Sequence, residues 1–363
     1  MTSAKATPSE KTSTETRPTN VFVSLVFKLF RGLRAGLWFF LRFAFVLWAT
    51  LVIYYSNLPW PGLRVALAVA FAAFSVWALC LTRRPRMGWA FAGLFLGVLV
   101  WFICIPPSHD RPWRPEVTVM PRAIIDGDTV RFTGFRNFEY RSRDDFTEHF
   151  EEREVSISHL TSVDLFVSYW KIGPVGHTFL SFNFDNAPPV CISIETRPEV
   201  GEGFAPIASL FKQFELIYVV GSEHDLVGVR VNHRDEETFM YPIRTTPAAA
   251  QRLFRVYLDR INELADRPEF YNLLSNSCTI NIVRYANVAG REGRFKLDQF
   301  LNGWIDRYLY RMGWVDTSLP FEELRRRSHI NEVVRAADDA PDFSERIRAF
   351  LPPKSPAPGS KNR

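Results

Sequence analysis

Apolar residues are concentrated in the first third of this 363-residue chain. Three apolar stretches occur there, and each is near the ~20 residues that a helix needs to cross a bilayer. They cover residues 35–56, 62–82 and 88–105. The pattern therefore predicts three transmembrane helices within a membrane region at 21–106.

The two ends of the chain lack any apolar period. Residues 1–20 consist mainly of Ser, Thr, Pro and charged residues, and residues 353–363 are rich in Pro, Ser and Lys. Such segments bury too little apolar surface to offset the entropy lost on ordering. We expect both to be disordered, and we assign 1–20 to a cytoplasmic tail.

Residues 107–352 have the patterns of one α+β domain. Short runs rich in β-branched and aromatic residues, separated by Gly, Pro, Asp and Asn, predict strands. These runs are 129–132, 154–157, 163–169, 177–184, 190–195, 216–220 and 226–231. The second half changes to helical spacing, with one helix expected to begin at Thr246-Pro247. A second helix is expected to run from near Cys278 to Gly290. The domain should therefore be an antiparallel sheet followed by helices.

Basic residues slightly outnumber acidic ones, 44 against 39, and part of them flank the apolar stretches. Lys28, Arg31 and Arg34 precede the first stretch, and three arginines lie between the second and third in RRPR. Positive flanks favour the cytoplasmic side. After three spans, the domain falls on the opposite side. We predict a multi-pass protein of the bacterial inner membrane whose domain lies in the periplasm, with no nucleic-acid partner.

The four cysteines are too few for a disulfide framework. Cys80 and Cys104 lie in apolar stretches, which leaves Cys191 and Cys278 in the polar remainder. A single bridge between these two stays an alternative. The spacings H-E-x-x-H, H-x-x-E-H and C-x-x-C do not occur, and there is no P-loop. No metal or other cofactor is predicted.

Cys278 stands at a predicted helix start, in YNLLSNSCTINI. A helix N-terminus stabilises a thiolate through unpaired backbone N–H groups and the helix dipole. Asn276 or Ser277 is expected to cap this helix, and the backbone donors there could serve as an oxyanion hole. The alternative is a small buried cysteine that packs under the helix.

A thiolate nucleophile needs a base nearby, and the base needs an orienting group. His177, on the predicted strand GHTFLSF, qualifies best. With the hairpin turn near 185–187, the numbers of facing residues sum to about 372, which places Glu195 opposite His177. Cys191 would then lie roughly 13 Å from this pair, at ~3.4 Å per residue. Cys278 is therefore preferred to Cys191 as nucleophile, although a slip of two pairs would reverse the choice.

An ordered set of motifs resembles a bacterial family with an Lnb-type N-terminal periplasmic domain. The motifs are RNFEYRS, VDLFVSYW, GHTFLSF, SIETR, FELIYVV, YNLLSNSCTINI, LNG and LPFEELRRRSHIN. The family is named after a lipoprotein intramolecular transacylase, and its motif order is also similar to circularly permuted papain-like (NlpC/P60-like) enzymes. In those enzymes the His precedes the Cys by about the 101 residues seen here.

The resemblance implies a permuted papain-like α+β domain after a three-helix transmembrane region. It implies His177 as base, Cys278 as nucleophile and Glu195 as an orienting residue. Asn276, Ser193 and Arg197 are candidates for substrate binding, with Arg197 facing an anionic group. The related transacylase has further spans after its domain, and three spans before the domain are predicted here.

The leading functional hypothesis is a membrane-anchored periplasmic thiol acyltransferase or hydrolase. It would act on lipid or lipoprotein acyl groups through a Cys–His dyad, so membrane lipids or lipoproteins are the expected partners. A second hypothesis is a cell-wall amidase or peptidase, which a polar, carboxylate-binding cleft would favour, whereas an apolar cleft would favour acyl chemistry. A third is a non-catalytic envelope scaffold or binding protein. The sequence makes no prediction of the oligomeric state.

Overall fold

The protein is described by a computed structural model, which covers residues 19–82, 84–170, 175–203, 205–290, 304–338 and 340–349. The expected tails, apart from Thr19 and Asn20, lie outside the described residues, as do Arg83 of the RRPR loop and the LNG motif at 301–303. The chain divides into two compact units, Met1–Cys104 and Ile105–Arg363.

The first unit contains three helices that are long and apolar enough to cross a membrane. They are α1 (Thr19–Tyr54), α2 (Pro61–Val76), which continues as a π-helical turn η1 (Trp77–Leu81), and α3 (Pro85–Cys104). The predicted number of long apolar helices is confirmed. Helix α1 begins well before the expected residue 35, because the apolar residues of the segment before Arg34 extend the helical pattern toward the N-terminus.

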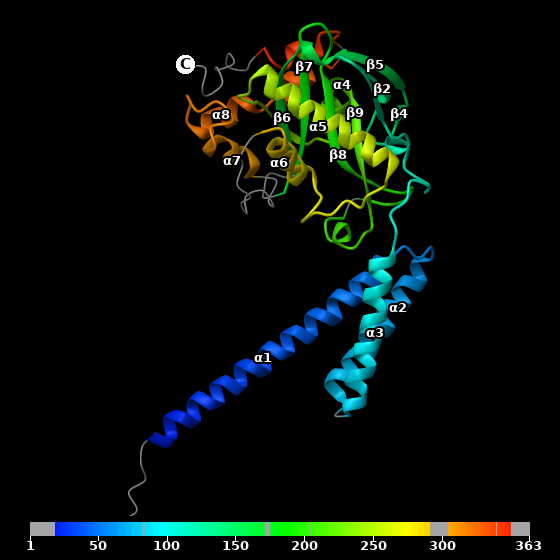
Figure 1. Cartoon of the computed structure of the whole chain (residues 1–363), viewed down its shortest axis with the longest axis vertical. Helices are drawn as coiled ribbons and strands as arrows, with labels where there is room; N and C mark the ends of the chain where they lie inside the picture. Colours follow the sequence, from blue (N-terminus) through cyan, green and yellow to red (C-terminus); the bar gives the residue numbers. More distant parts are fainter. Residues whose placement is uncertain are drawn as a thin grey trace, which may run out of the picture. The chain divides into compact units, whose positions relative to one another are not determined.

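The second unit is an α+β domain built on one large mixed sheet (Figure 1). Its main strands follow the order β1-β2-β9-β8-β7-β6-β10, and β5 pairs with the other edge of β2. The strands are β1 (Arg122–Asp126), β2 (Thr129–Arg136), β5 (Phe150–Ser156), β6 (Leu160–Tyr169), β7 (His177–Phe184), β8 (Val190–Arg197), β9 (Glu215–Gly221) and β10 (Glu237–Pro242), and a separate small pair is β3 (Glu139–Tyr140) with β4 (Phe146–Thr147). The sheet is not purely antiparallel as expected, because β2 and β9 run parallel where Arg136 meets Gly221.

Helices follow the strands toward the C-terminus, as the sequence predicts. They are α4 (Glu223–Gly228), α5 (Pro247–Asp266), α6 (Cys278–Val288), α7 (Ile305–Arg311), α8 (Phe321–Ser328), α9 (Asn331–Ala336) and α10 (Phe343–Arg346). Four short helical turns are η2 (Pro115–Val117), η3 (Ile157–His159), η4 (Ala208–Leu210) and the π-helical η5 (Val229–His233). The expected strand at 226–231 is wrong, since α4 and η5 occupy it.

The two faces of the sheet have different coverings, and strand alternation decides which residues meet them. Helix α5 lies across one face (Figure 1), where Phe254 and Tyr257 contact the even-numbered Phe182 of β7. The core on the other face contains the odd-numbered Phe179, together with Leu226 of α4 and apolar residues of α9 and α10. His177 has the parity of Phe179 and therefore lies on the α4 face.

Candidate active site

His177 is the first residue of β7, so its side chain lies at an end of the sheet. It pairs with Ser168 on the neighbouring strand β6 and is buried. Gly176 precedes it, and a Cβ atom there would lie only 3.0 Å from the Ser168 carbonyl oxygen and 3.2 Å from the Tyr169 ring. The glycine therefore lets the chain enter β7 close against β6 and fixes where the imidazole begins.

The hairpin of β7 and β8 has the predicted register. Phe179 pairs with Ser193 and Ser181 with Cys191, which is the alignment in which facing residues sum to 372. Continuing the register by two residues brings Glu195 opposite His177. The Glu195 carboxylate on β8 therefore lies beside the His177 imidazole on β7.

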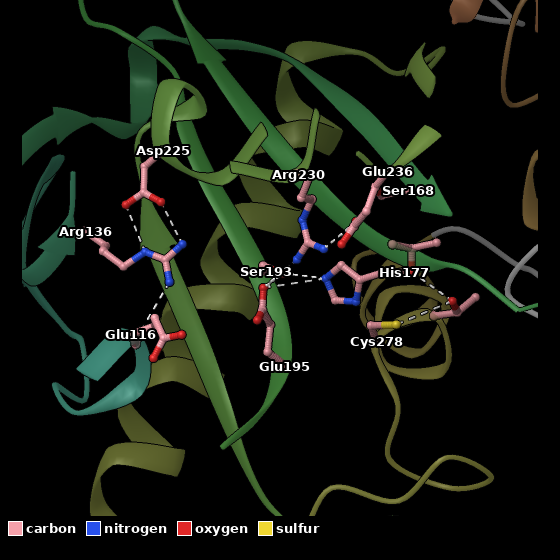
Figure 2. Close-up of polar contacts among 12 residues, drawn as sticks. Glu116, Arg136, Ser168, His177, Ser193, Glu195, Asp225, Arg230, Glu236 and Cys278 are labelled. Carbon is pink, nitrogen blue, oxygen red and sulfur yellow. Dashed lines mark hydrogen bonds and ion pairs between the residues drawn. The ribbon is translucent and has the colours of Figure 1, made fainter. Parts of the chain in front are cut away.

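Ser193 links the imidazole to the carboxylate (Figure 2). His177 Nε2 lies 2.7 Å from Ser193 Oγ, which donates to Glu195 Oε1 at 2.8 Å. The direct distance from His177 Nε2 to Glu195 Oε1 is 3.7 Å. Because the single hydroxyl proton goes to the carboxylate, Ser193 Oγ accepts from Nε2–H. In the neutral ring this assignment leaves Nδ1 without a proton.

Arg230 continues the network beyond the carboxylate. Its Nη2 donates to Glu195 Oε1 at 2.8 Å and its Nη1 donates to Glu236 at 3.1 Å. Ser168, the strand partner of His177, in turn donates to Glu236 at 2.6 Å. A closed set of polar contacts therefore connects β6, β7 and β8 with η5 around the imidazole.

The electrostatics of this network favour a neutral imidazole beside an ionised carboxylate. Burial, together with the charge of Arg230, lowers the pKa of His177 to about 3. Burial acts to raise the pKa of Glu195, but the charges of Arg230 and other nearby groups outweigh it and lower that pKa to about 2. At neutral pH, His177 is therefore an uncharged base and Glu195 a carboxylate.

Cys278 is the first residue of α6, which packs against β7 and β8. Thr178 Oγ1 and Thr279 Oγ1 lie 2.8 Å apart. These threonines directly follow His177 and Cys278, so their hydrogen bond holds the start of the helix beside the start of the strand. Figure 2 shows the His177 ring between Ser193 and the Cys278 side chain, with its second ring nitrogen on the Cys278 side.

The N-terminus of α6 is not capped by a side chain as expected. Ser277 occupies the N-cap position, but its hydroxyl is buried and has no hydrogen-bond partner among the described residues. Tyr271 lies against the helix start instead. Burial raises the pKa of its hydroxyl well above the usual value, and that hydroxyl hydrogen-bonds to the backbone and thiol of Cys278. The Tyr271 hydroxyl is therefore placed at the sulfur of Cys278.

A cavity of about 230 Å³ opens onto these groups. His177, Glu195, Tyr271 and Cys278 all line it. Cys278 is only 1% exposed, so a substrate would reach its sulfur through this cavity. Charged side chains make up much of the remaining lining: Arg114, Glu116, Arg136, Arg143, Asp144, Arg230, Arg234 and Glu236. Within the part of the chain that is described, no cluster of His, Cys, Asp and Glu could hold a metal ion.

Three residues expected as substrate ligands have other partners. Arg197 donates to the carbonyl oxygens of Val117 and Thr118 and stacks on Trp113, so it faces the interior rather than an anionic substrate. The Asn276 side chain shapes its own loop, donating to the Phe270 carbonyl oxygen. The hydroxyl of Ser193, as described, bonds to His177 and Glu195.

Cys191 lies in the core and not at the cavity. It faces Ser181, four residues along β7 from His177, and is fully buried among apolar side chains. Burial, together with the charge of Glu223, raises the pKa of its thiol well above the usual value. No disulfide joins Cys191 and Cys278, so the alternative of a bridge between them is wrong.

Four residues of the cavity were missed by the sequence analysis. Arg230, Arg234 and Glu236 lie in or just after a segment that the sequence analysis predicted as a strand. Tyr271 stands in the quoted motif YNLLSNSCTINI, seven residues before Cys278, without a pattern that indicates its contact. One sequence signal could have indicated a helix in this segment. Ser222 followed by Asp225 is a capping pattern, and it begins α4.

Comparison with known proteins gives one family match. No curated protein and no solved structure matches the chain. The family model of the Lnb N-terminal periplasmic domain matches residues 146–311, which include β7, β8 and α6. Together with the three apolar helices, this match identifies a membrane protein with a periplasmic domain. The match to residues 146–311 confirms the family resemblance that the sequence motifs predict for this part of the chain.

Proposed function

We propose that this protein is a cysteine-dependent acyltransferase or hydrolase that acts on the acyl groups of lipids or lipoproteins. The observation that carries the proposal is the state of His177. Its Nε2 proton is committed to the Ser193–Glu195 pair at 2.7 Å, and its unprotonated nitrogen lies on the side of Cys278 in the same cavity. This is the arrangement of an oriented base beside a nucleophile.

In the first half-reaction, Nδ1 of His177 takes the thiol proton of Cys278. The sulfur attacks the ester or amide carbonyl carbon, and its bond to that carbon forms as the carbonyl oxygen becomes an oxyanion. Tyr271, whose hydroxyl hydrogen-bonds at Cys278, is placed to donate to this oxyanion. When the intermediate collapses, the bond to the leaving group breaks, and that group takes the proton from His177.

In the second half-reaction, an amine or water resolves the thioester. His177 takes a proton from the attacking group, the new bond to the carbonyl carbon forms, and the carbon–sulfur bond breaks. The thiol of Cys278 recovers its proton from His177. Glu195, held as a carboxylate by Arg230, stabilises the imidazolium that exists between these transfers.

Lipid and lipoprotein substrates are supported by the rest of the chain. Three apolar helices would hold the domain at a membrane, where an enzyme meets acyl donors by lateral diffusion. The family name refers to a periplasmic domain, and we place this chain in the bacterial inner membrane. The order His on β7, acid on β8 and Cys on α6 supports a permuted papain-like arrangement.

A second candidate, a cell-wall amidase or peptidase, is favoured by one observation. The cavity at Cys278 is lined by charged side chains, including five arginines. A polar cleft of this kind suits a substrate with carboxylates at least as well as a bare acyl chain. The same dyad chemistry would then cleave an amide bond.

Turnover with defined substrates tests the proposal. The full-length protein in vesicles with radiolabelled phospholipid should release or transfer labelled acyl chains. Cys278→Ala and His177→Ala should abolish this activity, and Cys191→Ser should retain it. Cleavage of cell-wall peptides without any acyl release would favour the second candidate. Absence of both activities would point to the non-catalytic envelope role.

A further inference from the structure

The arginines that line the cavity fall into two groups. Three of them have carboxylate partners: Arg114 with Glu116 at 2.7 Å, Arg136 with Asp225 at 2.7 Å, and Arg230 with Glu195 at 2.8 Å and Glu236 at 3.1 Å. Their charges are neutralised within the protein. The other two are Arg143, which is exposed, and Arg234, which is partly buried.

Arg234 directly follows η5 and lines the same cavity as Cys278. Among the described residues, its guanidinium has neither an ion pair nor a hydrogen bond. Burial and the repulsion of nearby Arg230 lower the pKa of Arg234. Because the guanidinium lines the cavity without an ion-pair partner among the described residues, its N–H groups can donate to an anionic ligand that enters the cavity.

The charges of Glu195 and Glu236 act on Arg234, but no cavity carboxylate forms an ion pair with it in the described part of the chain. Glu195 and Glu236 both pair with Arg230, and Glu116 pairs with Arg114. Asp144 also lines the cavity, but it is exposed, and no ion pair joins it to Arg234 in the described part of the chain. An anionic ligand is therefore the ion-pair partner that this part of the cavity lining leaves room for at Arg234.

We propose that Arg234 binds the phosphate of a glycerophospholipid whose acyl ester is attacked by Cys278. This inference rests on the proposed function and names the chemical class of the acyl donor. A guanidinium donates two parallel hydrogen bonds to phosphate oxygens. In a glycerophospholipid the phosphate and the acyl esters share one glycerol, so a phosphate held at Arg234 places an ester carbonyl in the cavity that holds the thiol. The membrane helices bring the domain to such lipids.

The first test measures binding without turnover. Full-length Cys278→Ala protein in uncharged detergent is titrated calorimetrically with glycerol 3-phosphate, and Arg234→Gln is added to this background. Glycerol 3-phosphate should bind, and Arg234→Gln should weaken it about tenfold or more, because a hydrogen bond to a charged group is lost. The matched control is Arg335→Gln, an exposed arginine on α9 that pairs with Asp235. It should leave the affinity unchanged.

Other probes separate the possible sources of the anion. Inorganic phosphate that binds as tightly as glycerol 3-phosphate would overturn the lipid assignment in favour of a free-phosphate site. A dipeptide with a free carboxylate that binds more tightly than either would overturn it in favour of a peptide substrate. An unchanged affinity for glycerol 3-phosphate in Arg234→Gln would show that Arg234 does not bind the phosphate. Thermal unfolding of each variant identifies any that fail to fold, and Arg234→Lys supplies a second variant, which should retain part of the affinity.

The second test follows acyl transfer from vesicles. Phosphatidylglycerol should be a better donor than diacylglycerol of the same chains, and Arg234→Gln should raise KM for the phospholipid at least about tenfold with less effect on kcat. Equal use of both donors would contradict the inference. If neither donor acylates Cys278, the proposed function fails, whereas the calorimetric result still decides whether Arg234 binds a phosphate.

Discussion

Ser193 shows how a single hydroxyl defines the state of the candidate base. Its one proton goes to Glu195, so it accepts from His177 and selects the tautomer whose free nitrogen lies on the Cys278 side. The register that brings Glu195 to His177 was predictable from the turn residues. The role of Ser193 was not, because strand parity places Ser193 and Glu195 on one face without indicating which of them contacts the ring.

Ser193→Ala should lower acyl transfer by about ten- to hundredfold, because a hydrogen bond to a charged group is worth about 1.5–3 kcal/mol. Glu195 lies 3.7 Å from the ring and cannot fully replace the lost contact. Ser209→Ala, which removes another buried hydroxyl, one that donates to the Pro206 carbonyl oxygen, is the control. Steady-state assays of both variants check this, and an unchanged rate in Ser193→Ala would exclude Ser193 from orienting the base.

Acidification should destabilise the domain through His177. The unfolded chain takes up a proton near pH 6.5, whereas in the folded domain the pKa of His177 is lowered to about 3. The unfolded state therefore binds more protons, and stability falls as the pH drops from 6.5 toward 3, by at most about 1.4 kcal/mol per pH unit for this group. Glu195, whose pKa is lowered to about 2, adds a similar loss below pH 4.5.

His177→Gln should flatten this dependence between pH 6.5 and 5, where the carboxylate does not yet contribute. Thermal unfolding of the full-length protein and the variant in the same detergent checks it. An identical pH slope in the two proteins would mean that the imidazole is not held neutral.

At the scale of elements, alternation and capping correctly predicted the elements with clear local signals. Where the local signal was ambiguous, tertiary contacts determined whether the segment forms a helix or a strand. Strand β7 and helix α6 begin at the expected residues, and Thr246 caps α5 with its hydroxyl. The run 226–231 has the apolar alternation of a strand but forms α4 and η5, because Ser222 caps a helix and Leu226 and Val231 face the core beside β8 and β9. A short apolar run does not distinguish a strand from a buried helix.

The incorrect strand prediction for 226–231 explains why the site was only partly predicted. In a strand, Arg230 and Glu236 would be six positions apart along an extended chain and on one face. The π-helical turn η5 instead folds them together, so that Arg230 bridges Glu195 and Glu236. The proposed pairing of His177 with Cys278 depends only on a strand start and a helix start, and both could be predicted from the sequence.

The Thr178–Thr279 hydrogen bond should set the position of α6 against β7. Thr178→Val would leave the buried Thr279 hydroxyl without this partner, at a cost of about 1–3 kcal/mol in the free energy of unfolding. The double variant Thr178→Val/Thr279→Val removes both polar groups and should cost less than the sum of the single changes. Denaturant titration of the three variants measures the coupling, and strict additivity would show that the bond does not join the two elements.

At the scale of the whole molecule, the uneven distribution of apolar residues determines the organisation. Three apolar helices form one unit and the α+β domain forms the other. The number of spans and the positive residues near them suffice to predict the orientation. The mixed sheet was not predictable, because the single parallel contact of Arg136 with Gly221 depends on a close approach that a Cβ at Gly221 would block at 2.4 Å.

The predicted orientation places the domain in the periplasm. Alkaline phosphatase fused to the C-terminus should be active, and the same fusion in a variant lacking 85–104 should be inactive, since one span fewer reverses the side. Green fluorescent protein fused at the same position should give the opposite pattern. An active phosphatase after the deletion, or fluorescence of the intact chain, would contradict three spans with a cytoplasmic N-terminus.

The central claim is that Cys278 carries the acyl group. Full-length protein is incubated with phospholipid vesicles, quenched in acid and digested, and the cysteine peptides are examined by mass spectrometry before and after treatment with hydroxylamine. The account predicts an acyl mass on the peptide that contains Cys278, removed by hydroxylamine and absent from His177→Ala. An acyl mass on the Cys191 peptide, or none on either, would contradict it.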